Sequence, residues 1–563
     1  MLEVIPQTSL RDVDVVRIWG RLLRIWQSGF LDTRSARFTF ATFLFVLCLV
    51  PILAGPVVQY VYAHDAFIFL DGGWRVLNGQ RPQVDFSTNL GPIIFLFTAA
   101  GIAIGHSAGH ALVITQTLFG ALIAGLAYYL CVSRLTRITG ISFATTLVVL
   151  ALAPFNIGEP PWMLTYGMMY NRFGYALLGV IVIESMVAPR PGSTRLRDEM
   201  FGGGVTGFVC SFLFFLKITY CLVGVALVFM LLPYRQQVRR RFVGMGIAGL
   251  SFTLLVLAYL QFNLPALIRE LRLAAGGKHM GRLNPIGDAM TVVESTIILV
   301  ALGFLVAWLL SISNHSQLPL SRPWAVFVAA FFGFALLITN HQGGGQPLNA
   351  FVCILIASEI TGYYRSFSER HNSWLVPPAV LTSIALWAPL LALFIPLSIA
   401  FALPPLEPVF RWQNYTSEMR LAAPAVSDFR SRDTTPRYDR EDNPTPGNYA
   451  IFVNEGLALL KRHSSPSESV MSLEFSNPFS FSLQRDPPRG GTTCLQYGVT
   501  FDHSHRLSPE QLFGDADLVM LPRVFSAGLL ADAITRDYMQ ALIVRFHVVT
   551  RSSNWTLFRR NKH

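Results

Sequence analysis

Long apolar segments alternate with short polar connections over the first four hundred or so residues of the chain. About twenty helical residues, at about 1.5 Å each, cross a bilayer core about 30 Å thick. About eleven segments fit this length, near residues 39–61, 110–132, 141–155, 173–188, 201–216, 220–234, 243–262, 291–312, 324–339, 347–363 and 375–402. The pattern therefore predicts a multispanning α-helical membrane protein.

Two segments need a separate interpretation. If the apolar run over 91–105 crossed the membrane, every later loop would lie on the opposite side of the membrane, and Arg134 and Arg137 would lie outside. We therefore expect a helix that lies along the membrane surface. The run from 200 to 233 is too long for one helix and has basic residues at both ends, which predicts a hairpin with its turn near Lys217.

The basic residues indicate the orientation of the chain. An arginine-rich leader precedes the first apolar segment and includes Arg11, Arg17, Arg21, Arg24, Arg34 and Arg37. Such a leader favours an uncleaved first helix with a cytoplasmic N-terminus. An odd number of spans then leaves the C-terminus on the outer side.

The composition changes after about residue 403, where a charged, Pro-rich stretch begins. We expect a basic N-terminus over 1–38, a transmembrane domain over 39–403 with its first outer loop at 62–109, a linker over 404–447 and a domain over 448–563. In the last domain, helix-like segments at 454–463 and 529–543 alternate with strand-like segments at 470–475 and 518–524, and 544–551 with 554–560 resembles a closing hairpin. This predicts a small C-terminal α/β domain, located in the periplasm.

Composition supports the membrane assignment, since 52% of the residues are hydrophobic, 14% are charged and the mean hydropathy is +0.46. The net charge of +11 is explained by the excess of basic residues in the segments expected on the cytoplasmic side of the membrane. We therefore expect no nucleic-acid partner. Five of the six cysteines lie in apolar runs without metal-ligand spacing. These motifs predict neither a cofactor nor a bound metal ion. A bound divalent metal ion is kept as the alternative.

Three carboxylates, Asp65, Asp71 and Asp85, lie in the first outer loop together with His64. Asp65 follows the first predicted span by a few residues, at the outer membrane interface. One interpretation is a solvated N-cap, because Asp is preferred before a helix such as the one expected from Ala66. The other is a functional carboxylate.

The loop over 63–105 has an Asp soon after the first span, a short helix ending in WRVLNGQRP, a VDF turn and an apolar surface helix that begins with GP. This arrangement resembles that of the GT-C superfamily, the multispanning glycosyltransferases that use polyprenyl-phosphate-linked sugars. The resemblance implies an inverting, in-line displacement with Asp65 as the catalytic base, or alternatively as a residue that helps to bind the acceptor. His64, Asp71 and Asp85 are candidate substrate-binding residues, with a structural role as the alternative for Asp71 and Asp85. Many members have Asp-Glu where this chain has His64-Asp65-Ala66, so the second acid is not adjacent.

The phosphate of a carrier lipid would require cations on the outer side. Lys217 is a candidate for phosphate contact, with snorkelling as the alternative. Arg172, next to Tyr170 and Asn171 at the start of the fourth span, either contacts the substrate or anchors to lipid headgroups. Further substrate-binding candidates lie in a basic loop, at Lys278, His279 and Arg282, and in a Gly-rich turn, at His341 and Gln342. A solvated loop and an ordinary turn are the alternatives for these two segments.

Taken together, the sequence predicts a glycosyltransferase of a bacterial inner membrane, with its active site facing the periplasm. Its expected partners are a polyprenyl-phosphate-linked sugar donor, membrane lipids, and an acceptor that is a lipid, a glycan or a protein. A transporter or flippase of an anionic glycolipid is the alternative, although no internal repeat of the transporter kind is evident. A membrane scaffold or ligase acting on a lipid-linked polymer also stays open. The sequence does not identify the sugar or the acceptor.

Overall fold

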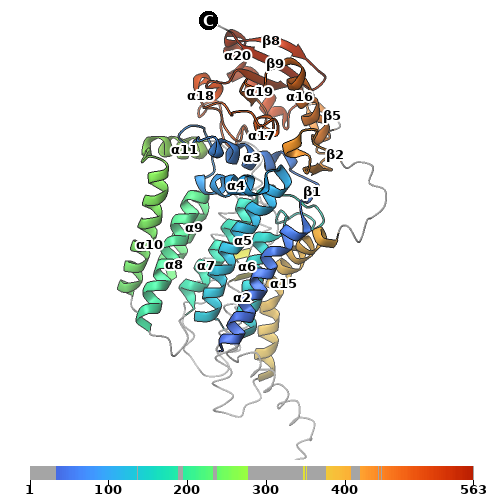
Figure 1. Ribbon diagram of the computed structural model, residues 1–563. Coiled ribbons are helices and arrows are strands. Elements are labelled where there is room, and N and C mark those ends of the chain that lie inside the picture. Colours follow the sequence, from blue (N-terminus) through green and yellow to red (C-terminus); the bar gives the residue numbers. More distant parts are fainter. Residues whose placement is uncertain are drawn as a thin grey trace, which may run out of the picture.

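A bundle of long helices with a mixed α/β region at one end makes up the structure, which is a computed structural model (Figure 1). It describes residues 33–135, 137–187, 195–231, 238–276, 347–348, 350–351, 376–406, 419–439, 441, 443–445 and 447–561. The predicted spans at 291–312 and 324–339, and most of the one at 347–363, lie outside the described residues. The predicted number of eleven spans therefore stays a prediction.

The bundle consists of α2 (Arg34–Ala54), α5 (Ala108–Ser133), α6 (Arg137–Leu152), α7 (Met169–Met186), α8 (Arg195–Leu216), α9 (Ile218–Leu231), α10 (Val238–Tyr259) and α15 (Val376–Leu406). Three helices, α3 (Ala63–Leu77), α4 (Pro92–Gly105) and α11 (Leu264–Gly276), lie across the end of the bundle, beneath the C-terminal region (Figure 1). The helix predicted over 91–105 thus lies crosswise as α4.

Two of the expected helix ends fall at identifiable residues. The α2 helix ends at Ala54, earlier than predicted, because Gly55 takes a positive φ of 78° and Pro56 follows it. The predicted hairpin turn is a break at the single residue Lys217, between α8 and α9.

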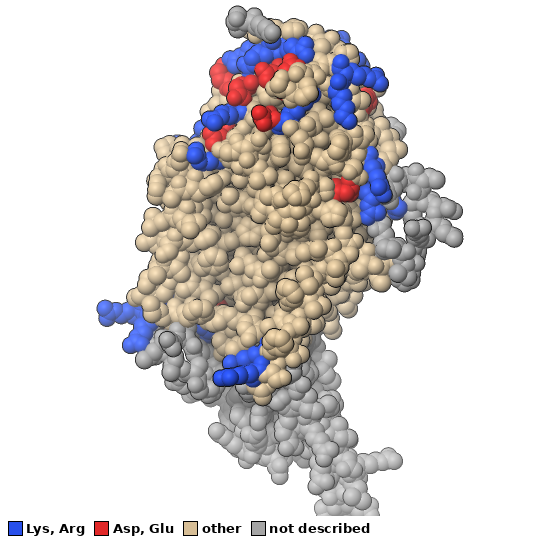
Figure 2. Space-filling model, in the orientation of Figure 1, with Lys and Arg blue, Asp and Glu red and all other residues tan. Residues whose placement is uncertain are grey.

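Four described helices are long and apolar enough to cross a membrane, namely those that span Arg34–Ala54, Ala108–Ser133, Glu199–Leu216 and Val238–Tyr259. Figure 2 shows an almost charge-free band over the bundle, between the charged C-terminal region and a few basic residues at the opposite end. These features are those of a multi-pass membrane protein.

The end of the bundle opposite the C-terminal region contains a buried ionic cluster. Glu184 of α7 pairs with Arg134, the residue directly after α5, at 2.5 Å and with Arg241 of α10. Close packing of α8 against α10 brings these helices together, since an added Cβ on Gly203 would lie 2.1 Å from the carbonyl oxygen of Arg241. Small residues such as glycine allow membrane helices to approach this closely. A charge buried between such helices is stabilised by partners of opposite charge.

Residues 419–445, which the sequence analysis assigned to a linker, form short elements that pack against the first outer loop. They are β2 (Met419–Arg420), the 3₁₀ helix η2 (Pro424–Val426), β3 (Arg430–Ser431), β4 (Arg437–Tyr438) and β5 (Pro444–Thr445). The β3 strand pairs in parallel with β1 (Val58–Gln59), which directly follows α2. This pairing holds the C-terminal region against the residues between α2 and α3.

The C-terminal region has a four-stranded sheet in the order β6-β7-β9-β8. Its elements are α16 (Tyr449–His463), β6 (Val470–Ser472), α17 (Phe479–Ser482), α18 (Pro509–Phe513), β7 (Leu518–Pro522), α19 (Gly528–Asp537), α20 (Met539–Arg545), β8 (Phe546–Arg551) and β9 (Trp555–Arg560). The parallel pairing of β6 with β7 and the antiparallel hairpin of β8 with β9 confirm the predicted mixed α/β region. The buried side chains form two clusters, one joined to the bundle and one beneath α18, α19 and α20.

Candidate active site

The candidate site lies where the N-terminus of α3 meets the C-terminal region. Tyr62 precedes α3 in a left-handed conformation with φ of 54°, and Asp65 occupies the first helical turn. The backbone N–H of Ala63 donates to Asp433 Oδ2 at 2.9 Å. Asp65 is therefore not the N-cap that one interpretation of the sequence predicted. The carboxylate of Asp433, which lies outside the helical bundle, accepts the hydrogen bond from the N-terminus of α3 instead.

Asp65 is 4% exposed and has contacts on several sides. Its Oδ1 lies 3.3 Å from His64 Nε2, and its carboxylate accepts a hydrogen bond from the backbone N–H of Met168. An added Cβ on Gly167 would lie 3.3 Å from Asp65 Oδ2, so the loop before α7 approaches this carboxylate closely. Met168, like Tyr62, has a left-handed backbone. Such conformations cost about 1–3 kcal/mol each and are concentrated at functional sites.

The electrostatic environment of Asp65 is suited to proton transfer near neutral pH. Burial raises the pKa of Asp65 to about 6, the charge of His64 opposes this rise, and the negative charge of Asp433 adds to it. A carboxylate with such a pKa is ionised at neutral pH and is still a stronger base than an exposed aspartate. Asp65 can therefore accept a proton from a hydroxyl group that reaches it.

A lysine lies in the same neighbourhood. Lys217 Nζ is 4.8 Å from the centroid of the Tyr170 ring and donates to Asn171 Oδ1 at 3.4 Å. Burial lowers the pKa of Lys217 to about 7. Tyr170 comes two residues after Met168, whose backbone N–H donates to Asp65, so the start of α7 contacts both the lysine and the carboxylate. An arriving anion would favour the charged form of Lys217.

The other two carboxylates of the first outer loop have local partners. Asp71 is fully buried and accepts from Arg75 Nε at 2.8 Å and from Asn477 Nδ2 at 3.2 Å. Arg75 also donates to the carbonyl oxygen of Pro488 at 2.7 Å. Asp71 thus belongs to the seam between α3 and the C-terminal region, and burial raises its pKa. These contacts favour a structural role for Asp71.

Asp85 lies in the turn after α3, where it accepts from the backbone N–H of Arg81 at 2.7 Å. Its other carboxylate oxygen is 3.9 Å from Arg489, whose side chain is largely exposed. The backbone of Asp85 accepts from Gly490, so this turn is another contact with the C-terminal region.

Arg172 is buried at the start of α7 and donates from Nη1 to the carbonyl oxygen of Phe155. Its Nε and Nη2 have no hydrogen-bond partner within the described part of the chain. Glu159, in the loop that precedes α7, accepts from the Tyr62 hydroxyl at 2.8 Å. Lys278, His279, Arg282, His341 and Gln342 lie outside the described residues.

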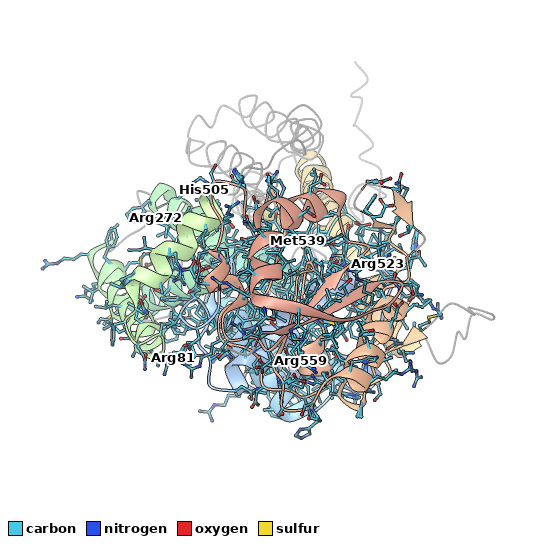
Figure 3. All side chains as sticks on the ribbon, turned by 90° about the horizontal axis from the view of Figure 1, so that it is seen from above. Arg81, Arg272, His505, Arg523, Met539 and Arg559 are labelled. Atoms are coloured by element: carbon cyan, nitrogen blue, oxygen red, sulfur yellow. The ribbon has the colours of Figure 1, made fainter. Side chains whose placement is uncertain are left out.

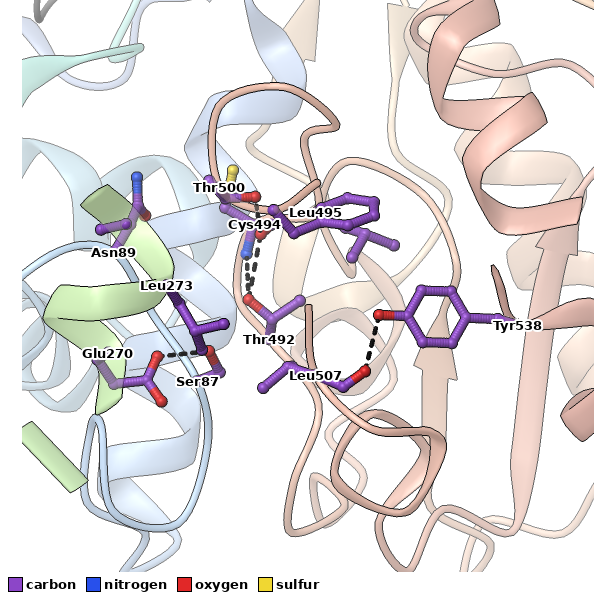
Figure 4. Close-up of a pocket in the computed structure, with 12 residues that line it drawn as sticks. Ser87, Asn89, Glu270, Leu273, Thr492, Cys494, Leu495, Thr500, Leu507 and Tyr538 are labelled. Atoms are coloured by element: carbon purple, nitrogen blue, oxygen red, sulfur yellow. Dashed lines mark hydrogen bonds between the residues drawn. The ribbon is translucent and has the colours of Figure 1, made fainter. Parts of the chain in front are cut away.

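A recess opens beside the site, between α11 and the C-terminal region (Figure 4). Its empty volume is about 380 Å³, part of it open to solvent. Glu270 of α11 accepts from Ser87 Oγ at 2.5 Å and from the backbone N–H of Thr88 at 3.2 Å. Burial raises the pKa of Glu270. Cys494 lies on the opposite wall.

Several groups at this site have no signal in the sequence that could have identified them. Asp433 and Cys494 are more than 360 residues from Asp65 and lie in segments without a motif. Glu270 looked like an ordinary residue of an amphipathic loop. No group of three or more His, Cys, Asp or Glu side chains that could hold a metal ion occurs in the described segments.

Comparison with known proteins gives one kind of match. No family model and no curated protein matches the chain. The crystal structure of ArnT from Cupriavidus metallidurans bound to undecaprenyl phosphate is similar, with 11% identity and a TM-score of 0.41, over 92% of this chain and 97% of that chain. The apo structure of the same protein gives 12% identity and a TM-score of 0.36 over the same shares.

Both TM-scores are below 0.5, too low to support an argument about activity.

Proposed function

We propose that the protein is a membrane glycosyltransferase that moves a sugar from a polyprenyl-phosphate carrier to an acceptor hydroxyl, with Asp65 as the general base. The observation that supports this most is the buried Asp65 carboxylate, whose pKa is about 6, at the junction of the bundle with the C-terminal region. A base with this pKa at the end of a membrane bundle suits a reaction between a membrane-held donor and an acceptor from the aqueous side.

In the proposed reaction, the acceptor oxygen attacks the anomeric carbon of the sugar and transfers its proton to Asp65. The bond between the anomeric carbon and the phosphate oxygen breaks, and its electron pair leaves with the phosphate. The configuration at the anomeric carbon inverts because attack and departure are in line.

The departing phosphate gains negative charge, which a nearby cation stabilises. Lys217 has this role in the proposal. Its amino group lies over the ring of Tyr170, and Met168, two residues earlier, donates its backbone N–H to Asp65. In the proposal, the base and the cation act on the opposite charge changes at the two ends of the displacement.

The recess of Figure 4 is the proposed route for the acceptor. Hydroxyl and amide groups line it, from Ser87, Asn89 and Thr500, together with the apolar side chains of Leu273 and Leu495. Such a mixture suits an amphipathic acceptor. The proposed orientation has this end of the bundle and the C-terminal region in the periplasm.

Mass spectrometry of envelope lipids and glycans would test the proposal in cells. Cells that contain the protein should have a glycoconjugate one sugar residue heavier than its counterpart in cells lacking it, and should release unglycosylated polyprenyl phosphate. Cells with Asp65→Asn at equal protein level should resemble the deletion. Envelope profiles that are the same in all three strains, with the carrier-linked sugar present, would contradict the proposal.

A further inference from the structure

The surface of α11 that faces away from the bundle has a second hollow. It lies between α11 and the loop of the C-terminal region that contains His505, and its empty volume is about 790 Å³, including the part open to solvent. Arg272 and His505 lie near each other in the view from above (Figure 3). We name this hollow the α11 groove, and its lining is Pro265, Ile268, Arg269, Arg272, Leu273 and His505.

The α11 groove adjoins the apolar outer surface of the bundle. Gln261 and Phe262 both have left-handed backbones, with φ of 55° and 53°, and the chain turns there from α10 into α11. Phe262 is 56% exposed and Ile268 is 47% exposed. Exposed apolar side chains also cover α10, including Leu255. An apolar surface therefore continues from a membrane-spanning helix into the groove.

The rim of the α11 groove is basic. Arg269 is held in place by an ion pair with Glu270 at 2.9 Å and by donation to the carbonyl oxygen of Gln83 at 3.1 Å. Arg272 is exposed and has no carboxylate within ion-pair distance among the described residues. His505 lies across the groove, 3.3 Å from Asp502. The arginines thus offer guanidinium groups to a ligand above an apolar floor.

We propose that the α11 groove binds a membrane phospholipid whose phosphate-containing head group has a net negative charge. The phosphate would contact Arg272 and Arg269, because a guanidinium group matches phosphate oxygens in shape and charge. The start of an acyl chain would lie on Pro265 and Ile268, continuous with the apolar surface of α10. A free inorganic anion would leave this floor without a function, so charge and apolar surface together favour a lipid.

This lipid would lie next to the recess of Figure 4, since Leu273 lines both hollows. The proposal does not depend on the transfer reaction or on Asp65. Loss of lipid binding and loss of sugar transfer can therefore be observed separately.

Native mass spectrometry of the purified full-length protein in mild detergent tests the proposal. Dioleoylphosphatidylglycerol and its zwitterionic counterpart dioleoylphosphatidylcholine would be titrated into wild type, Arg272→Glu, Arg272→Gln and Arg523→Glu. The Arg523→Glu control changes the charge equally, on the opposite side of the C-terminal region (Figure 3). Thermal unfolding would check that each variant is folded.

We expect wild type to bind phosphatidylglycerol more tightly than phosphatidylcholine. Arg272→Gln should weaken phosphatidylglycerol binding about fivefold, the effect of one basic residue near an anionic lipid. Arg272→Glu should weaken it further, and Arg523→Glu should have no effect. Equal binding of both lipids by wild type, or equal losses in Arg272→Glu and Arg523→Glu, would overturn the proposal. Displacement of the lipid by an equimolar amount of inorganic phosphate would also overturn it, since the groove would then be a simple anion site.

Discussion

Replacement of Asp433 by Asn should shift the pH dependence of sugar transfer. Asp433 is buried beside Asp65, accepts from the first backbone N–H of α3, and raises the pKa of Asp65 by like-charge repulsion. This repulsion is smaller than the effect of burial and the opposing effect of His64. We therefore expect Asp433→Asn to lower the pKa of Asp65 by about half a unit to one unit, or about 0.7–1.4 kcal/mol.

The sign of the effect follows from the role of Asp65 as a base. The reaction requires ionised Asp65, so kcat/KM of the wild type should fall about tenfold per pH unit below about pH 6. In Asp433→Asn this decrease should begin at lower pH. At pH 5 the wild type should retain about a tenth of its plateau rate and the variant about a third. The plateau itself should be lower, because a weaker base accepts a proton less readily.

Release of polyprenyl phosphate by purified protein in lipid, measured from pH 4.5 to pH 8, is the suitable assay. Asp428→Asn is the matched control, because Asp428 caps α5 through Gly109 and His110 and contributes no effect on Asp65. The control should lose a little stability and keep the wild-type pH profile. An unchanged profile in folded Asp433→Asn would refute the coupling between the two carboxylates.

Three further outcomes are expected. A periplasm-active reporter fused after His563 should be active, and a cysteine placed at Arg240 should resist an impermeant thiol reagent added from outside; the reverse pattern would contradict the proposed orientation. Lys217→Ala should weaken binding of the donor phosphate and Lys217→Arg should keep part of it, whereas unchanged donor affinity in folded Lys217→Ala would make this residue a snorkelling lysine. Glu184→Ala should destabilise the protein by about 3–5 kcal/mol, seen as a lower unfolding temperature, because two buried arginines lose their counter-charge; an unchanged unfolding temperature would contradict this.

Local patterns of hydrophobicity and charge predicted much of the local structure. The break at Lys217, the crosswise helix α4 and the hairpin of β8 with β9 were all predicted from apolar run length, basic flanks and strand-like alternation. These features depend on residues close together in the sequence, where the cost of burying or exposing each side chain can be judged directly.

Contacts between distant segments could not be predicted in this way. Asp433 lies in a polar stretch that looked like a linker, yet it accepts from Ala63 at the start of α3. The pairing of β1 with β3 involves only two residues on each strand. Asp71 looked like a possible substrate ligand, whereas its partners Arg75 and Asn477 are visible only after folding. A single sequence shows which groups need partners but not which distant group supplies them.

The most direct test of the central claim is the transfer rate of purified Asp65→Asn in lipid, with Asp85→Asn as the matched control. The Asn side chain keeps the size of Asp65 and removes its basicity, so release of polyprenyl phosphate should fall about 10²- to 10⁴-fold, the usual loss when a general base is removed. Asp85→Asn should retain most of the activity, since the contacts of the Asp85 side chain within the described part of the chain are with its own turn and with an exposed arginine. Near-normal transfer by a folded Asp65→Asn protein would contradict the assignment of Asp65 as the base.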